Sequence, residues 1–224
     1  MNSTGPTVLK ASNAEELMQH VLNHHAPPST LIVCSSKAAF LEALQKSHQF
    51  AGPEDAGQAQ SAPSSGTGQF LERPTLRLLS TSRTLKLAFC PDITHLRAYL
   101  ATYSSTISKR LAESKGDTAL RLPGATPILA ILNPVELHRP TSAFSAQGLN
   151  RTLSVAVEAA HSTGSKLILC ETPTSDRDPW DEELSILNVT TKRLGEMSVG
   201  RTVKAKTVAQ RWCTFDRVSS HEAF

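Results

Sequence analysis

Basic side chains near the C-terminal end are the residues whose type and spacing best fit a chemical role. Positions 192 to 211 hold one acid, Glu196, and six basic residues, which are Lys192, Arg193, Arg201, Lys204, Lys206 and Arg211. Lys204 and Lys206 alternate with Val203 and Ala205, so in a strand both ammonium groups lie on one face. Such a face either contacts nucleic-acid phosphates or is a solvated sheet edge whose lysines prevent unwanted strand pairing.

An acidic segment with a single tryptophan precedes this basic region. Residues 176–183 read DRDPWDEE and contain five acids, one arginine and Trp180. The acids lack the regular spacing of a calcium-binding loop. The segment is either a solvated loop or an interaction loop in which Trp180 anchors a partner, because tryptophan is enriched at the energetic centres of protein interfaces.

Other residue types capable of chemistry form no complete site. His20 and His24 are four apart and could face one metal, but no carboxylate or cysteine completes the set, so a solvated helix face is expected. No GxSxG elbow is present. The four cysteines lie far apart at the ends of apolar runs, which indicates buried free thiols. We expect no metal site, and an enzyme with an unrecognised site is kept as a third class of function.

Composition places the chain among proteins of one globular domain. It has 224 residues and a formal net charge of +3, too small by itself to imply a nucleic-acid partner. No apolar run approaches the ~20 residues that span a bilayer, and the N-terminus lacks the pattern of a secretory signal. We expect a protein of the nucleus or cytoplasm with no membrane partner.

Periodic and apolar segments alternate along the chain. Helices are predicted over 13–25, 37–45, 93–103 and 146–163, and the first begins with a capping box of Asn13 and Glu16. Strands are predicted over 30–34, 75–80, 84–90, 127–132 and 166–170, and 75–80 is alternatively a strand end followed by a loop. This alternation indicates the α/β class, with a mainly parallel sheet covered by helices on both faces.

The predicted domain covers residues 1–215. Within it, 51–69 has no apolar residue larger than alanine and is predicted to be a disordered loop. Residues 185–194 and 201–215 are rich in threonine and valine, and they predict a C-terminal antiparallel hairpin that extends one edge of the sheet. Residues 216–224 are predicted to be a flexible tail.

The order of these elements resembles the core of RecA-like recombinases. In that family a first strand leads to the phosphate loop, and a later apolar strand carries the acid that manages magnesium. A long helix, another strand and a basic, Thr-rich hairpin follow. The corresponding pieces here are TLIVC, PILAILNPVEL, the helix 146–163, KLILC and the hairpin, across roughly 29–215. The resemblance implies a RecA-like fold.

The residues that would handle a nucleotide in this family are missing. After TLIVC the chain reads SSKAAF, which has no glycine to turn N–H groups toward phosphates, so Lys37 is expected at the surface. The apolar strand ends in Asn133, and an amide is a poorer magnesium ligand than a carboxylate. Glu136 is expected to cap or face solvent. Asp92, where the family keeps its catalytic acid, has no phosphate cradle beside it. We therefore expect no catalytic residue and no cofactor.

In these respects the chain resembles RecA-like proteins that lack ATPase motifs, such as subunits of the Shu complex and of Elongator's RecA-like subcomplex. The resemblance implies a non-catalytic subunit of a nuclear recombination or DNA-repair complex, a pseudo-ATPase that packs against other RecA-like subunits in a hetero-oligomer and contacts DNA or RNA. The alternative that it implies is an Elongator-type subunit acting in tRNA modification.

Overall fold

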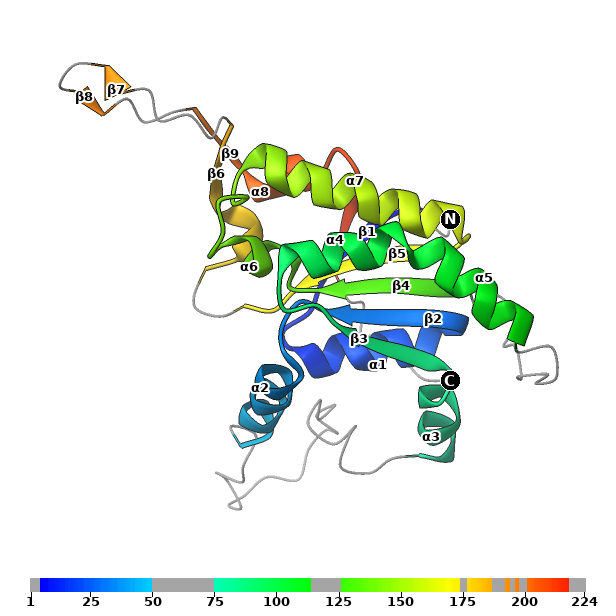
Figure 1. Cartoon of the computed structure of the whole chain (residues 1–224). Coiled ribbons are helices and arrows are strands. Elements are labelled where there is room, and N and C mark those ends of the chain that lie inside the picture. The colour runs from blue at the N-terminus through cyan, green and yellow to red at the C-terminus, as the bar shows by residue number, and fades with distance from the viewer. Residues whose placement is uncertain are drawn as a thin grey trace, which may run out of the picture.

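A six-stranded, all-parallel sheet forms the centre of the molecule (Figure 1). The computed structural model describes residues 5–49, 75–113, 126–173, 177–186, 192–193, 196–197 and 201–217. In spatial order the strands are β10 (Thr214–Arg217), β1 (Thr7–Lys10), β5 (Lys166–Glu171), β4 (Thr126–Leu132), β2 (His25–Val33) and β3 (Leu85–Phe89). The predicted α/β class with a parallel sheet is confirmed.

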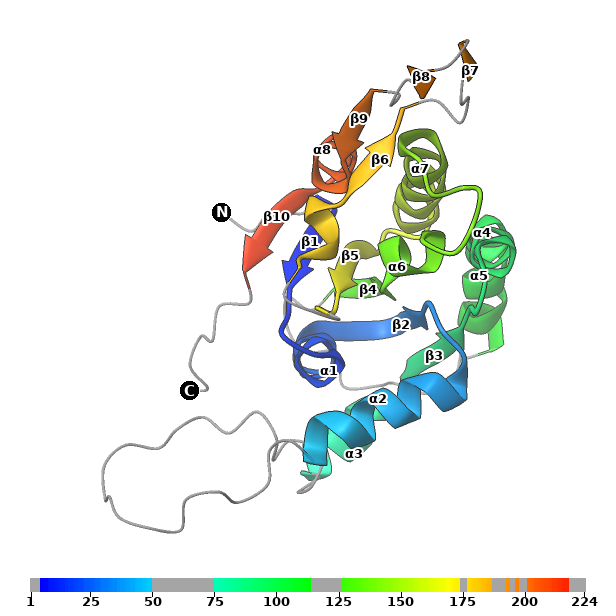
Figure 2. The same cartoon turned by 90° about the vertical axis from the view of Figure 1, so that its left-hand side faces the viewer.

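Helices cover both faces of this sheet (Figures 1 and 2). One face carries α1 (Ala14–His24), α2 (Lys37–Gln49) and α3 (Leu76–Ser82). The other carries α4 (Ile93–Ala101), α5 (Tyr103–Glu113), α6 (Pro134–His138), α7 (Ala146–Ser162) and α8 (Ala205–Ala209). The steps from β1 to β2 and from β2 to β3 cross the sheet in one direction, whereas the later steps cross it in the other. Right-handed crossovers therefore place the two groups of helices on opposite faces.

The two faces of the sheet bury separate apolar clusters. Ile32, Leu129 and Leu169 pack with the α4, α5 and α7 layer, whereas their neighbours Leu31, Ile128 and Ile168 pack with α1 and α2. Side chains alternate between the faces of a strand, so a strand that is covered on both faces needs an apolar residue at every position. This explains why the runs LIV, ILAIL and LIL are continuous in the sequence.

Several predicted elements are confirmed with small shifts of boundary. The helices predicted at 13–25, 37–45, 93–103 and 146–163 are α1, α2, α4 and α7, and the strands predicted at 30–34, 84–90, 127–132 and 166–170 are β2, β3, β4 and β5. Gly164 follows α7 with φ +61°, in the left-handed region that glycine favours after a helix. All four cysteines are free and buried, as predicted.

The strand predicted over 75–80 is wrong, because these residues belong to α3. Thr75 caps this helix, its side chain accepting a hydrogen bond from the amide of Leu78 at 3.1 Å. Leu76 and Leu79 are 86% and 51% exposed, so the alternation of apolar residues is not buried against a sheet. A capping side chain and the lack of a neighbouring strand favour the helix.

The antiparallel pairing predicted for the C-terminal region is confirmed, but its expected place at the edge of the parallel sheet is wrong. Antiparallel pairing joins β6 (Glu183–Ser185) to β9 (Thr202–Lys204) and β7 (Lys192–Arg193) to β8 (Glu196–Met197). These pairs do not extend the parallel sheet. Instead α8 follows β9 directly, because Ala205 and Val208 are buried against the core, and β10 then adds to the sheet as a parallel strand beside β1.

Two further boundaries follow from the structure. β1 was not predicted, since its four residues are too short to give a periodic signal, yet it lies between β10 and β5. β10 ends at Arg217, two residues beyond the predicted domain limit. The predicted loop 51–69 and residues 218–224 of the predicted tail lie outside the described residues. Within the described ranges, no helix is long and apolar enough to cross a membrane.

Candidate functional site

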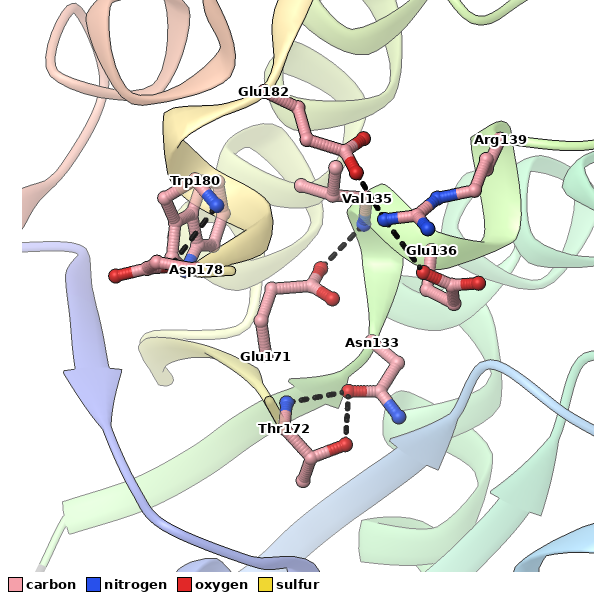
Figure 3. Close-up of polar contacts among 9 residues, drawn as sticks. All are labelled: Asn133, Val135, Glu136, Arg139, Glu171, Thr172, Asp178, Trp180 and Glu182. Carbon is pink, nitrogen blue, oxygen red and sulfur yellow. Dashed lines mark hydrogen bonds and ion pairs between the residues drawn. The ribbon is translucent and has the colours of Figure 1, made fainter. Parts of the chain in front are cut away.

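The carboxyl ends of β4 and β5 are joined by Asn133, which follows β4 (Figure 3). Asn133 has φ 60° and ψ 44°, a left-handed conformation that asparagine tolerates better than most residues. Its side-chain oxygen accepts hydrogen bonds from the amide and the hydroxyl of Thr172 at 2.8 and 3.0 Å. RecA-like proteins have a magnesium-binding acid at the corresponding position. The Asn133 amide that stands there in this chain links the ends of β4 and β5.

Glu171 ends β5 and caps α6 from inside the protein (Figure 3). Its Oε1 accepts a hydrogen bond from the amide of Val135, in the first turn of α6. The side chain is buried, and burial raises the pKa of this carboxyl from its ordinary 4.5 to about 8. The amides of Val135 and Glu136 favour the charged form, but loss of water outweighs them. At neutral pH Glu171 therefore holds its proton.

Arg139 connects α6 to the loop that carries the acidic segment. Its guanidinium makes an ion pair with Glu136 at 3.2 Å and a second one with Glu182 (Figure 3). Glu182 follows the short 3-10 helix η2 (Pro179–Asp181). These contacts hold η2 against the carboxyl ends of β4 and β5. Glu136, for which a surface role was predicted, is engaged in this ion pair.

The last residue of α6 is fixed by a buried hydrogen-bond chain. His138 is fully buried, and its Nδ1 lies 2.7 Å from the carbonyl oxygen of Pro134. Its Nε2 lies 3.0 Å from the hydroxyl of Thr152, which in turn accepts from Nε of Arg97 at 3.0 Å. Burial lowers the pKa of His138, which favours the neutral ring, and a protonated Nδ1 satisfies the Pro134 carbonyl.

The start of α1 lies at the carboxyl end of β1, where a parallel sheet commonly binds ligands. β1 leads to a helix on one face and its neighbour β5 leads to elements on the other, an arrangement that opens a crevice between the strand ends. A helix N-terminus at such a place attracts anions. Here the predicted cap by Asn13 is confirmed, because its side chain accepts from the amide of Glu16 at 2.8 Å, and the Glu16 carboxylate accepts from the amide of Ser12, one residue before the cap, at 2.6 Å. The chain's own carboxylate therefore stands where an anion would bind.

A cavity of about 530 Å³ opens in this crevice. Its walls come from the end of β1, from η2, and from Phe215 and Asp216 of β10, and Glu171 and Lys206 also contribute. The volume is within the range of small-molecule pockets, ~300–1,000 Å³. No group of histidine, cysteine and acidic residues within the described ranges could hold a metal ion.

Trp180 forms part of the cavity wall and is not an exposed anchor. It is 5% exposed, and its ring meets that of Phe215 edge to face at 5.6 Å between centroids. Asp178 caps η2 by accepting from the amide of Trp180 at 3.0 Å, and this turn directs the ring into the core. Trp180 is therefore buried within its own chain, and its role as an anchor for a partner stays a prediction.

One of the predicted basic residues, Lys204, lies beside an acid of the DRDPWDEE segment. Lys204 pairs with Asp181 at 3.1 Å, and Lys10 of β1 pairs with Asp178 at 3.4 Å. The ammonium of Lys206 lies 5.4 Å from the ring centroid of Phe215. In the sequence, the acidic segment 176–183 and the basic residues after position 191 are separate regions. Pairing of β6 with β9 places them side by side.

The other predicted basic residues are not gathered into one cluster with these. Arg201 and Arg211 are exposed, and neither makes an ion pair with another described residue. Lys192 and Arg193 form β7, of which the backbone is described.

The remaining candidates have structural surroundings. Lys37 is exposed, as predicted. Asp92 caps α4, accepting from the amide of His95 at 2.8 Å and pairing with its Nδ1 at 2.6 Å. The rings of His20 and His24 stack at 4.4 Å between centroids.

In a comparison with protein families, residues 118–223 match the family described as SPAC22G7.03-like. The matched stretch contains β4, α6, α7, β5 and the C-terminal region up to β10. It therefore includes most of the cavity wall and the contacts of Asn133, Glu171 and Arg139. Its description states no activity. Among curated proteins, none matches the chain.

The raised pKa of Glu171 predicts a pH-dependent stability. The folded protein keeps this proton up to about pH 8, whereas the unfolded chain releases it near 4.5, so the free energy of unfolding falls as pH rises between these values. Glu171→Gln resembles the protonated carboxyl and should lose less stability between pH 5 and 8 than the wild type. Urea denaturation at several pH values measures this.

Glu42→Gln provides the control, since Glu42 is an exposed carboxylate paired with Lys46. It should retain the wild-type loss of stability between pH 5 and 8. A Glu171→Gln profile parallel to that of the wild type would show that Glu171 is ionised in the folded protein.

The pairing of Lys204 with Asp181 leads to a prediction for nucleic-acid binding. Asp181→Asn frees an ammonium group, so binding of single-stranded DNA should strengthen and the slope of log affinity against log salt should steepen by up to about 0.7. Glu42→Gln makes the same change of charge beside Lys46 on α2. Equal effects of the two variants in a fluorescence titration would remove the β6–β9 region from the binding surface.

Proposed function

We propose that this chain is a non-catalytic subunit of a multiprotein complex, specifically a nuclear recombination or DNA-repair complex, and that it acts by binding partner proteins and nucleic acid. The observation that carries the non-catalytic part is the acidic start of α1. Asn13 caps the amide of Glu16, the Glu16 carboxylate accepts from the amide of Ser12 just before the helix, and Glu15 adds a second acid in the first turn. A phosphate placed there would be repelled by these carboxylates.

The resemblance to RecA-like proteins supports the proposed absence of catalysis when β1, rather than β2, is taken as the first strand of the sheet. In that family the first strand leads to the phosphate loop, and the first strand of this sheet is β1 rather than the TLIVC segment of β2. The residues between β1 and α1 are Ala11, Ser12 and Asn13. They include neither glycine nor lysine, so the requirement for a phosphate cradle fails at this position as it does at SSKAAF.

The carboxyl ends of β4 and β5 supply no ionised carboxylate in place of the acid that binds magnesium in RecA-like proteins. Asn133 is engaged by Thr172, and Glu171 is a buried carboxyl whose raised pKa keeps it neutral. A neutral carboxyl is a weak ligand for a hard divalent cation. The assignment to a recombination or repair complex rests on the resemblance in element order and on the basic residues of the C-terminal region, of which Arg201 and Arg211 are exposed.

Absence of nucleotide binding is the first expected outcome. Titration of the purified chain with MgATP, followed by isothermal calorimetry, should show no saturable heat. The variant Glu16→Gln, which reduces the negative charge at the start of α1, should not create binding, because the loop still lacks glycine and lysine. Saturable MgATP binding by the wild type that Glu16→Gln strengthens would place a nucleotide at α1 and overturn the pseudo-ATPase proposal.

Partner recovery tests the assembly role. Affinity purification of the tagged chain from its own cells, followed by mass spectrometry, should recover recombination or repair proteins in stoichiometric amounts. Recovery of tRNA-modifying Elongator subunits in their place would contradict the recombination assignment and support the alternative. Recovery of no stable partner would contradict the proposal that the chain works as a subunit.

A further inference from the structure

β10 is a free edge of the parallel sheet. It pairs with β1 on one side, and no described strand lies on its other side (Figure 2). The amide of Thr214 donates to the carbonyl of Pro6 at 3.0 Å. In a parallel ladder every second residue faces the same neighbour, so Thr214 and Asp216 face β1, whereas Phe215 and Arg217 direct their N–H and C=O groups outward. Such an edge is a template for an added strand.

The cavity opens directly beside this edge. Phe215 and Asp216 belong both to β10 and to the cavity wall. Trp180 and Pro179 form another part of the wall, which gives the cavity an aromatic and prolyl lining. Its volume of about 530 Å³ leaves room for one or two side chains of a strand laid along β10. Strand addition gains affinity from main-chain hydrogen bonds and specificity from such pockets.

Positive charge from three separate elements gathers at the cavity. Lys10 comes from β1, Arg177 from the loop before η2 and Lys206 from α8. Two exposed or half-exposed acids, Asp178 and Asp216, oppose these three cations. Glu171, at the inner end, adds no charge at neutral pH because burial raises its pKa to about 8. The cavity therefore carries a positive excess.

We propose that the β10 edge and its cavity bind an extended acidic segment of a partner protein. The segment adds a strand to β10, inserts an aliphatic or aromatic side chain into the cavity against the wall formed by Phe215 and Trp180, and places flanking carboxylates near Lys206 and Lys10. This inference rests on the proposed role of the chain as a binding subunit and names the chemistry of one partner contact. A nucleic acid would suit the cations but has no main-chain N–H and C=O ladder to pair with β10.

The experiment selects peptides from a random ten-residue library displayed on phage, with the purified full chain as the target. Enriched sequences should carry two or more acids around an aliphatic or aromatic residue. A synthetic, fluorescein-labelled copy of the most enriched peptide then provides an affinity by anisotropy. Circular dichroism and thermal unfolding verify the fold of every variant.

Arg217→Pro compared with Arg217→Ala isolates the strand pairing. Both variants remove the same charge, but proline also removes the outward N–H, and proline is tolerated on an edge strand whose N–H faces solvent. The proline variant should bind the peptide roughly tenfold more weakly than the alanine variant, the loss expected for a missing hydrogen bond with its partner left unpaired.

Lys206→Glu compared with Lys37→Glu isolates the charge. The two changes alter net charge equally, but Lys206 lines the cavity whereas Lys37 is exposed at the start of α2. Lys206→Glu should weaken peptide binding at least about tenfold at low salt, and Lys37→Glu should change it little. This pair also keeps the test decisive if the proline variant does not fold.

Several outcomes would overturn the inference. These are failure to enrich any peptide, equal affinities of the proline and alanine variants, and equal effects of the two lysine variants. Single-stranded DNA that displaces the peptide and is insensitive to proline at position 217 would identify the occupant as nucleic acid. Dimers in sedimentation that Arg217→Pro abolishes would identify it as a second copy. Each result concerns this edge alone, whereas partner recovery from cells tests the subunit role separately.

Discussion

The hydrogen bond from the amide of Val135 to the buried carboxyl of Glu171 organises the carboxyl ends of β4 and β5. The Glu171 carboxyl caps the first turn of α6. The side chain of Asn133, at the end of β4, accepts a hydrogen bond from Thr172, which follows β5. Arg139 then ties α6 to the loop after η2, and His138 ties the other end of α6 to α7 and α4 through Thr152 and Arg97. Loss of water around the carboxyl keeps it protonated, so this junction holds no net buried charge.

The same edge of the sheet is where an α/β protein usually binds its ligand, and the chain has filled most of the available positions itself. Asn13 caps α1, Glu16 accepts from the amide of Ser12, the side chain of Asn133 accepts from Thr172, and Asp92 caps α4. The cavity beside β10, with its aromatic wall and its cations, remains open at this edge. The fold thus has the geometry of a ligand-binding sheet, and we propose that this cavity binds a segment of another protein.

The charged segments show how tertiary structure changes the meaning of a sequence pattern. Taken alone, the six basic residues suggest a surface for phosphates and DRDPWDEE suggests a separate acidic loop. Antiparallel pairing of β6 with β9 brings them together, so that Asp181 neutralises Lys204 and the surface is mixed. Trp180, between these acids in the sequence, turns inward because η2 directs its ring onto Phe215.

The sequence alone predicted the α/β class, the strands β2 to β5 and the helices α1, α2, α4 and α7, because short apolar runs indicate buried strands and helical periodicity indicates a helix buried on one side. It also predicted the cap of α1 by Asn13, which depends on residues three apart. Only the tertiary structure decided that 76–82 is a helix, that β10 lies parallel to β1, and that Glu171 and Trp180 are buried. These outcomes depend on residues distant in the chain, such as the contact of Thr214 with Pro6, and no local pattern encodes such a contact.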